Sequence, residues 1–248
     1  MMQDPRYMNT SAAATADMDV GLRAYMLGVY NYMTTALGVT GLVAFGTKML
    51  AVTTTADGQM MLTPFGAAIF TSPLMWVIAL APLGMVFWLS ARLHAMSVSK
   101  AQTLFYIFAG LMGMSLSSIL ITYTGASVAR AFFITAGAFA GLSLYGYTTK
   151  RNLAPIGTFL VMGVIGLILA SLVNLFVQSQ GMEFMISVIG VLLFAGLTAW
   201  DTQRIKSMYM ASDGHAVAQR KSIHGALTLY LDFINMFLFL LRLIGNRE

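Results

Sequence analysis

Two aspartates lie in or beside long apolar stretches of the chain, where an ionised side chain is expensive. Asp232 lies near the middle of the last apolar run, and Asp201 follows Trp200 at the end of the run before it. A charge at the centre of a bilayer costs about 2.5 to 3.5 kcal/mol on insertion scales. We therefore expect Asp232 to face protein or water, and we treat it as a candidate functional residue. The alternative is a structural hydrogen bond between helices.

The helical neighbours of Asp232 are also polar. Thr228 precedes it by four residues and Asn235 follows it by three, so all three side chains share one helix face. This pattern predicts a supporting polar face on an otherwise apolar helix. A helix of this kind is expected to pack centrally, with its polar side lining a cavity.

Together, Asp201 and Asp232 could form a proton-sensitive contact. Two carboxylates close together in a low dielectric cannot both ionise cheaply, so the pair would share one proton and tie the sixth and seventh helices together. Loss of that proton would leave two charges that repel each other or recruit a cation. With Asn235, hydroxyls and carbonyls, the pair could hold Ca²⁺ weakly and transiently. Taken alone, Asp201 could instead form a local ion pair with Arg204.

A second basic residue is a candidate latch. Arg92 ends the second apolar run on the same predicted side of the membrane as Asp201, and Pro82 is expected to kink that run. An ion pair between Arg92 and Asp201 would hold the pathway closed. The alternative is that Arg92 only anchors the helix end at the cytoplasmic surface.

The composition indicates what surrounds the segments that carry these residues. Of 248 residues, 58% are hydrophobic and 9% are charged, whereas soluble domains carry about 25% charged residues. The partner of most of the surface is therefore the lipid bilayer. The chain has no cysteine, and its basic residues are scattered between apolar runs, so we expect no nucleic-acid binding.

Seven apolar runs have about the length that a helix needs to cross a membrane. They are Leu27 to Leu50, Ser72 to Ala91, Ala101 to Tyr123, Ala129 to Thr149, Ala154 to Val177, Met182 to Trp200, and Ile223 to Leu241. The sequence predicts an all-α polytopic membrane protein with a mobile polar cytoplasmic tail over 1–22 and a seven-helix domain over 23–248. A β-barrel is a poor alternative, because these runs are apolar on every face.

Basic residues predict the orientation. With a cytoplasmic N-terminus, ten of the 14 lysines and arginines fall inside and four outside, as the positive-inside rule requires. The C-terminus then lies outside, and the longest cytoplasmic connection runs from Arg204 to Ser222. In a bacterium this membrane would be the cytoplasmic (inner) membrane.

Small residues suggest where helices approach closely. Gly137 and Gly141 form a GxxxG pair in the fourth run, and Gly110, Gly113 and Ser117 lie together in the third. The alternative is that glycine is simply frequent in spanning helices.

Two stretches, Leu197 to Lys206 and Gly225 to Leu238, resemble the signature of the Bax inhibitor family, also called the transmembrane Bax inhibitor motif family. The resemblance implies seven helices with the last one surrounded by the other six. It also implies a pH-sensitive Ca²⁺ leak controlled by an aspartate pair that matches Asp201 and Asp232. Some bacterial relatives bind and restrain a membrane-anchored ATP-dependent protease.

These observations leave two function classes open. The first is a Ca²⁺ or other cation leak gated by protons at Asp201 and Asp232, with no tightly bound cofactor. The second is a regulatory partner of a membrane protease, without transport. We expect no enzyme, because the chain has no HExxH, no GxSxG and no cysteine, and His94, His215 and His224 have no metal-binding spacing. A retinal receptor is disfavoured because the last run has no lysine for a Schiff base.

Overall fold

The computed structural model describes residues 5–55 and 59–247, with side chains from Val20 onward. Seven of its helices are long and apolar enough to cross a membrane. These helices are α1 (Pro5–Ala51), α3 (Leu74–Arg92), α4 (Val98–Thr122), α5 (Gly125–Thr148), α6 (Ala154–Val177), α7 (Gln180–Ser207) and α8 (His215–Ile244). The all-α, polytopic membrane fold predicted from the sequence is therefore confirmed.

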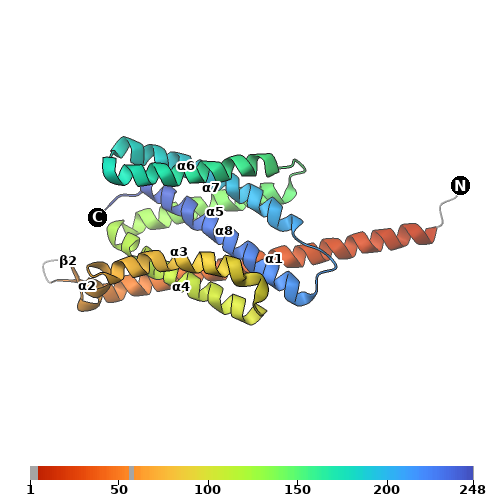
Figure 1. Cartoon of the computed structure of the whole chain (residues 1–248), viewed down its shortest axis with the longest axis horizontal. Helices are drawn as coiled ribbons and strands as arrows, with labels where there is room; N and C mark the ends of the chain where they lie inside the picture. Colours follow the sequence, from red (N-terminus) through yellow and green to blue (C-terminus); the bar gives the residue numbers. More distant parts are fainter. Residues whose placement is uncertain (1–4, 56–58, 248) are drawn as a thin grey trace.

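Helix α8 is the central element of the bundle. It packs against α1, α4, α5 and α7, while α3 packs mainly on α4 and α6 mainly on α7. Figure 1 shows α8 crossing obliquely between α6 and α7 on one side and α3 and α4 on the other. The central position of the last helix is as expected, although four helices rather than six make its main contacts. Because α8 is enclosed, a polar group on it can avoid lipid.

The last two spanning helices are longer than the apolar runs that predict them. Helix α7 continues past Trp200 to Ser207, and α8 begins at His215. Most of the predicted cytoplasmic connection from Arg204 to Ser222 is therefore helical, and only residues 208–214 link the two helices. Apolar periodicity could not detect these extensions, because they are polar turns that continue a helix beyond its buried part.

Helix α1 is also longer than its apolar run. It contains 47 residues, so at about 1.5 Å per residue it is roughly 70 Å long, against about 30 Å of hydrocarbon. Figure 1 shows its first part projecting beyond the bundle. The helix runs through residues 5–22, where the sequence predicts a mobile tail, and the mobility of that segment stays a prediction.

Between α1 and α3, the chain forms elements that the sequence analysis did not predict. A short antiparallel hairpin pairs β1 (Val52–Thr54) with β2 (Met60–Leu62), and α2 (Pro64–Phe70) follows it. The Thr63 side chain caps α2 by accepting a hydrogen bond from the Gly66 amide. A short 3₁₀ turn, η1 (Leu93–Ala95), joins α3 to α4.

Close helix contacts occur at some glycines and not at others. A Cβ atom on Gly113 would lie 2.6 Å from the Thr40 carbonyl oxygen, and one on Gly146 would overlap the Ala199 carbonyl. Within the described residues, Gly137 and Gly141 have no neighbouring atom within 4 Å of such a Cβ position. Gly137 and Gly141 therefore make no close helix contact within the described residues, which favours the alternative that glycine is simply frequent in spanning helices.

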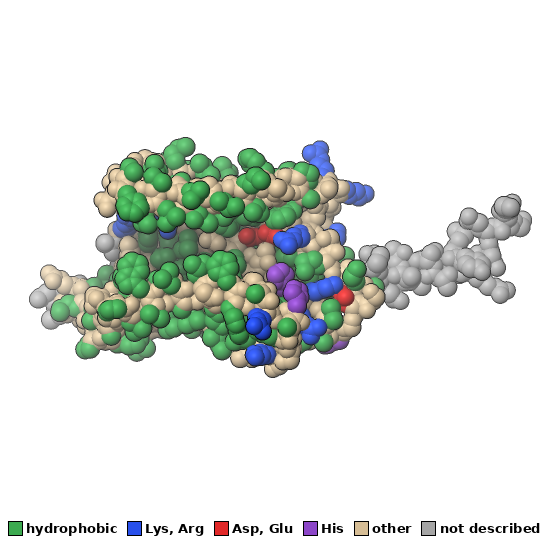
Figure 2. All heavy atoms as spheres, in the orientation of Figure 1, with side chains coloured by type: hydrophobic (Ala, Val, Ile, Leu, Met, Phe, Trp, Pro, Cys, Tyr) green, Lys and Arg blue, Asp and Glu red, His purple; other side chains and the backbone are tan. Residues whose placement is uncertain are grey.

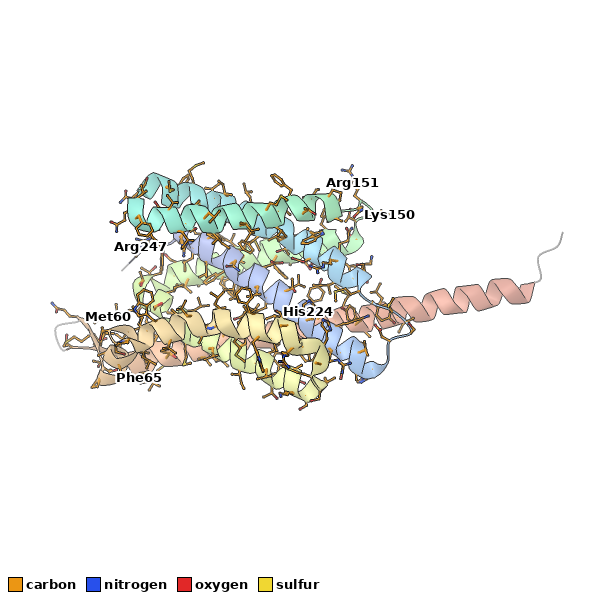
Figure 3. The ribbon with its side chains drawn as sticks, viewed as in Figure 1. Met60, Phe65, Lys150, Arg151, His224 and Arg247 are labelled. Carbon is orange, nitrogen blue, oxygen red and sulfur yellow. The ribbon has the colours of Figure 1, made fainter. Side chains whose placement is uncertain are left out.

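The two ends of the bundle differ in charge. Figure 2 shows hydrophobic side chains over the outer faces of the helices and basic and histidine side chains gathered mainly towards one end. In Figure 3, Lys150 and Arg151 lie at that end, whereas Met60, Phe65 and Arg247 lie at the opposite end. This distribution agrees with the charge asymmetry on which the predicted orientation rests.

Candidate functional site: an acid pair between the last two helices

Asp201 and Asp232 meet between α7 and α8. Their side chains lie next to each other, close enough for one carboxyl to donate a hydrogen bond to the other when it carries a proton. Both residues are buried, with exposed fractions of 5% for Asp201 and 4% for Asp232. Figure 2 shows acidic side chains in the hollow between the two groups of helices, next to a basic one. The structure thus brings together the two aspartates that the sequence singles out.

The contact between these carboxyls needs a proton. Asp232 Oδ2 is fully enclosed, and no other donor in the described part of the chain reaches it. An ionised carboxylate only accepts hydrogen bonds, so two such groups can be joined only when one of them carries a proton. Two bare carboxylates at this place would repel each other away from water, where the repulsion is strong. The geometry therefore fits a pair that holds one proton between α7 and α8.

Arg204 is the basic residue beside the pair. Its guanidinium nitrogen lies 3.9 Å from Asp201 Oδ1, and the Arg204 side chain is 57% exposed. The same guanidinium lies 5.5 Å from the centre of the Trp200 ring. Arg92 forms no ion pair with any described acid, so the predicted latch between Arg92 and Asp201 is not formed in this structure.

The predicted supporting residues do not bind the acids. The Thr228 hydroxyl donates to the His224 carbonyl of its own helix at 3.2 Å, and the Asn235 amide donates to the Leu231 carbonyl at 2.8 Å. Asn235 lines a hollow of about 710 Å³ between α6, α7 and α8 that neither aspartate lines. The polar face of α8 is thus present, but it does not form one continuous cavity around Asp232.

Two hydroxyl clusters near the acid pair join helices that are distant in sequence. The Tyr30 hydroxyl lies 2.6 Å from Ser143 Oγ, which lies 3.0 Å from the hydroxyl of Thr202, the residue after Asp201. The Tyr230 hydroxyl, two residues before Asp232, lies 2.7 Å from Thr40 Oγ1. Sequence reasoning missed both clusters. Buried hydroxyls in apolar runs were the available signal, but nothing in the sequence pairs them.

The acid pair lacks the ligands of a tight metal site. Among the described residues, no group of three or more histidine, aspartate or glutamate side chains could hold a metal ion. Two carboxylates alone leave most of the six to eight oxygen positions around Ca²⁺ to water or to backbone carbonyls. The arrangement fits transient contact with a cation better than storage of one.

Hollows approach the pair from both ends of the bundle. The hollow that contains Asn235 reaches α8 three residues from Asp232, which is about 4.5 Å along the helix. At the other end, a hollow of about 420 Å³ is lined by Trp200 and Arg204, one turn or less from Asp201 on α7. Phe194 and Phe239 both line the first of these hollows, where they stack with ring centres 5.9 Å apart. These hollows are the two candidate inlets to the acid pair, and neither aspartate lines either of them.

Seven spanning helices, a central last helix and an acid pair buried beside it define the class of this molecule. The chain belongs to the Bax inhibitor family: the family model described as "Inhibitor of apoptosis-promoting Bax1" matches residues 22–248. The resemblance noted in the two signature stretches is thereby confirmed over the whole membrane domain.

Three bacterial relatives match along nearly their whole length. The Rickettsia prowazekii protein printed as "Uncharacterized protein RP147" is 46% identical over 239 residues, which cover 96% of each chain. The Escherichia coli K12 protein "Inner membrane protein YbhL" is 44% identical over 232 residues, covering 92% of this chain and 94% of YbhL. A Caulobacter vibrioides protein is 43% identical over 246 residues, covering 98% and 97%.

Proposed function

We propose that this protein is a pH-sensitive leak pathway for Ca²⁺ or a similar cation, gated by the proton that Asp201 and Asp232 share. The contact between two enclosed carboxyls on adjacent helices is the observation that carries this proposal. Such a contact holds α7 against α8 while the proton is present. When the proton leaves, repulsion separates the helices and exposes two carboxylates to an entering cation.

The two inlets support this proposal. They approach the acid pair from opposite ends, so a small separation of α7 from α8 could join them. The stacked Phe194 and Phe239 rings line the first inlet and would have to part. In the proposed closed state, apolar contact and the shared proton together exclude ions.

The site is proposed to work in a bacterial inner membrane, the location that the name of YbhL gives for that relative. The N-terminus is proposed to be cytoplasmic and the C-terminus outside, as the basic residues predict. Protons and Ca²⁺ are then the proposed ligands of the pair. Both bind transiently.

The test is Ca²⁺ influx into liposomes that contain the purified protein and a Ca²⁺ indicator, recorded from about pH 6 to about pH 8. We expect influx to increase with pH in the wild type, because deprotonation separates the helices. In Asp232→Asn, the amide supplies a permanent hydrogen-bond donor to Asp201, so influx should stay low at every pH. Lys100→Gln is the control: it removes an exposed charge from α4 at a position that lines neither inlet, and it should keep the wild-type profile.

Two results would contradict the proposal. One is an Asp232→Asn variant that keeps the wild-type pH profile. The other is the absence of influx at every pH from folded wild-type protein, which would favour the alternative of a regulator that binds a membrane protease without transport. In that case, Asp201→Asn and Asp232→Asn should both retain partner binding.

A further inference from the structure

At the end of the bundle opposite the basic residues, a hollow of about 600 Å³ lies between the β1–β2 hairpin, α2, α3 and α4. Four methionines line it: Met60 and Met61 from β2, Met75 from the first turn of α3, and Met114 from α4. Figure 3 labels Met60 at this end. Three separate segments of the chain thus contribute methionines to the lining of one space.

The gathering of methionines is particular to this hollow. The chain has 20 methionines in 248 residues, so about one would be expected among 16 lining residues. The larger hollow between α1 and α5, of about 750 Å³, has two methionines, and the one between α6, α7 and α8 has none. Apolar filling alone would use leucine and isoleucine equally well at these positions, whereas methionine adds a polarisable sulfur donor.

The other polar groups of the hollow are poor ligands. It is lined by no acid, histidine or lysine. The Thr71, Ser118 and Thr122 hydroxyls each donate to a carbonyl of their own helix, at 2.7, 3.1 and 2.9 Å. Apart from these hydroxyls and that of Ser115, the methionine thioethers are the side-chain donor atoms of this hollow.

The hairpin that carries Met60 and Met61 is held firmly at its base. The Thr63 amide donates to the Ala51 carbonyl at 3.0 Å, and the Thr63 hydroxyl donates to the Leu50 carbonyl at 2.7 Å. Gly66 packs directly on the same Ala51 backbone, which fixes α2 against the end of α1. The β2 methionines are 47% and 55% exposed, so an ion can reach them.

We propose that Met75 and Met114, together with Met60 or Met61, form a binding site for a soft monovalent metal ion, Cu(I) in particular. Met60 and Met61 are neighbours on β2, so their side chains point to opposite faces of the hairpin and one of them supplies the third sulfur. Thioether sulfur selects Cu(I) over harder ions. Uncharged ligands in apolar surroundings also favour a single charge, because the cost of taking an ion out of water rises with the square of its charge. The indole of Trp76, which lines the same hollow, presents an additional face to a cation.

The site is independent of the acid pair. It lies at the far end of the bundle and uses ligands of a different chemistry, so either proposal can fail without the other. The chain has no cysteine, and a thioether cannot be lost to a disulfide. Oxidation of the methionines to sulfoxides is the change that would remove these donors.

The experiment is a calorimetric titration of the purified full-length protein in detergent with Ag(I), a redox-stable ion of the same softness and charge. We expect saturable binding that weakens by about tenfold or more, or about 1.4 kcal/mol, when Met60, Met61, Met75 and Met114 are all changed to leucine. Leucine preserves apolar volume while removing the sulfur. The matched control changes four exposed methionines elsewhere, Met49, Met162, Met185 and Met210, to leucine and should bind as the wild type does.

Additional measurements make the result decisive. Zn²⁺ should neither bind at the site nor displace Ag(I), and X-ray absorption of the Cu(I) complex should show sulfur neighbours. Asp232→Asn should bind Ag(I) normally, which separates this site from the gate. Equal Ag(I) binding by the wild type and the folded four-leucine variant would overturn the proposal, as would no saturable binding by the wild type.

Discussion

Arg204, and not Arg92, is the basic residue that reaches Asp201, with 3.9 Å between guanidinium nitrogen and carboxylate oxygen. The pairing is local, because Arg204 lies one turn farther along the same helix. Its guanidinium also remains over the Trp200 ring. A positive charge at this position favours the ionised form of Asp201 and so opposes the shared proton.

The first prediction concerns the two arginines. Arg204→Gln should move the Ca²⁺ influx profile to higher pH. Without the neighbouring positive charge, the acid pair would keep its proton up to a higher pH. Arg92→Gln should leave the profile unchanged. The effect of Arg204→Gln on unfolding should stay below about 1 kcal/mol, since the side chain is mostly exposed. A shift with Arg92→Gln alone would instead support the latch that the sequence suggests.

The second prediction is a pH dependence of stability. A contact that holds a proton in the folded bundle and releases it when the helices separate adds stability at low pH, and this stability is lost as pH rises. Thermal unfolding of the wild type in detergent should therefore occur at lower temperature at about pH 8 than at about pH 6. Asp232→Asn should reduce that difference. A wild-type midpoint that rises over this interval would contradict the assignment of a shared proton to the pair.

The third prediction uses glycines with different surroundings. Gly146→Ala should destabilise the protein by about 1 to 3 kcal/mol, because the new methyl group would overlap the Ala199 carbonyl and push α5 from α7. Gly137→Ala should be neutral or stabilising by up to about 1 kcal/mol, since no described atom lies near its Cβ position and alanine favours the helix. Unfolding midpoints of the two variants, measured side by side, provide the check. Equal losses would show that the contact at Gly146 is not the cause.

The fourth prediction concerns the hydrogen bonds that hold α8 in the centre. The Tyr230 hydroxyl lies 2.7 Å from Thr40 Oγ1, and Thr40 Oγ1 also lies 2.9 Å from the Ala109 carbonyl oxygen, so α8, α1 and α4 meet there. Tyr230→Phe should cost about 0.6 to 1.7 kcal/mol, the range of interhelical hydrogen bonds in membranes. A double-mutant cycle with Thr40→Val should yield a coupling energy of similar size. Additive losses would mean that the two hydroxyls do not stabilise each other.

The sequence predicted the features of the fold that follow from its position in a lipid bilayer. A span must be apolar over its whole length, so seven runs identified seven helices, and an acid in such a run had to be enclosed. Asp232 illustrates how far this reasoning extends: its cost in lipid predicted a buried position. The sequence could not predict which helices pack against one another, because apolar side chains pack on many surfaces equally well.

Most differences between the sequence-based predictions and the structure lie in polar segments. Residues 215–222 continue α8 although they carry no apolar run, and the hairpin of β1 and β2 is too short for its alternation to be recognised. Thr228 and Asn235 share a face with Asp232, yet each satisfies its own helix first. Helical spacing predicts which side chains lie near one another, but it does not predict which of them bond.

The seven residues between α7 and α8 have a consequence for reversibility. Lys221 fastens this link by donating to the Asp213 carboxylate at 2.6 Å and to the Met208 carbonyl at 2.9 Å. A short, fastened link keeps the separated helices at high effective concentration, so the two carboxyls meet again without a diffusive search. In the proposed opening, the same link would act as a hinge, so α7 and α8 would separate asymmetrically, away from the link and towards the end where Phe194 and Phe239 lie.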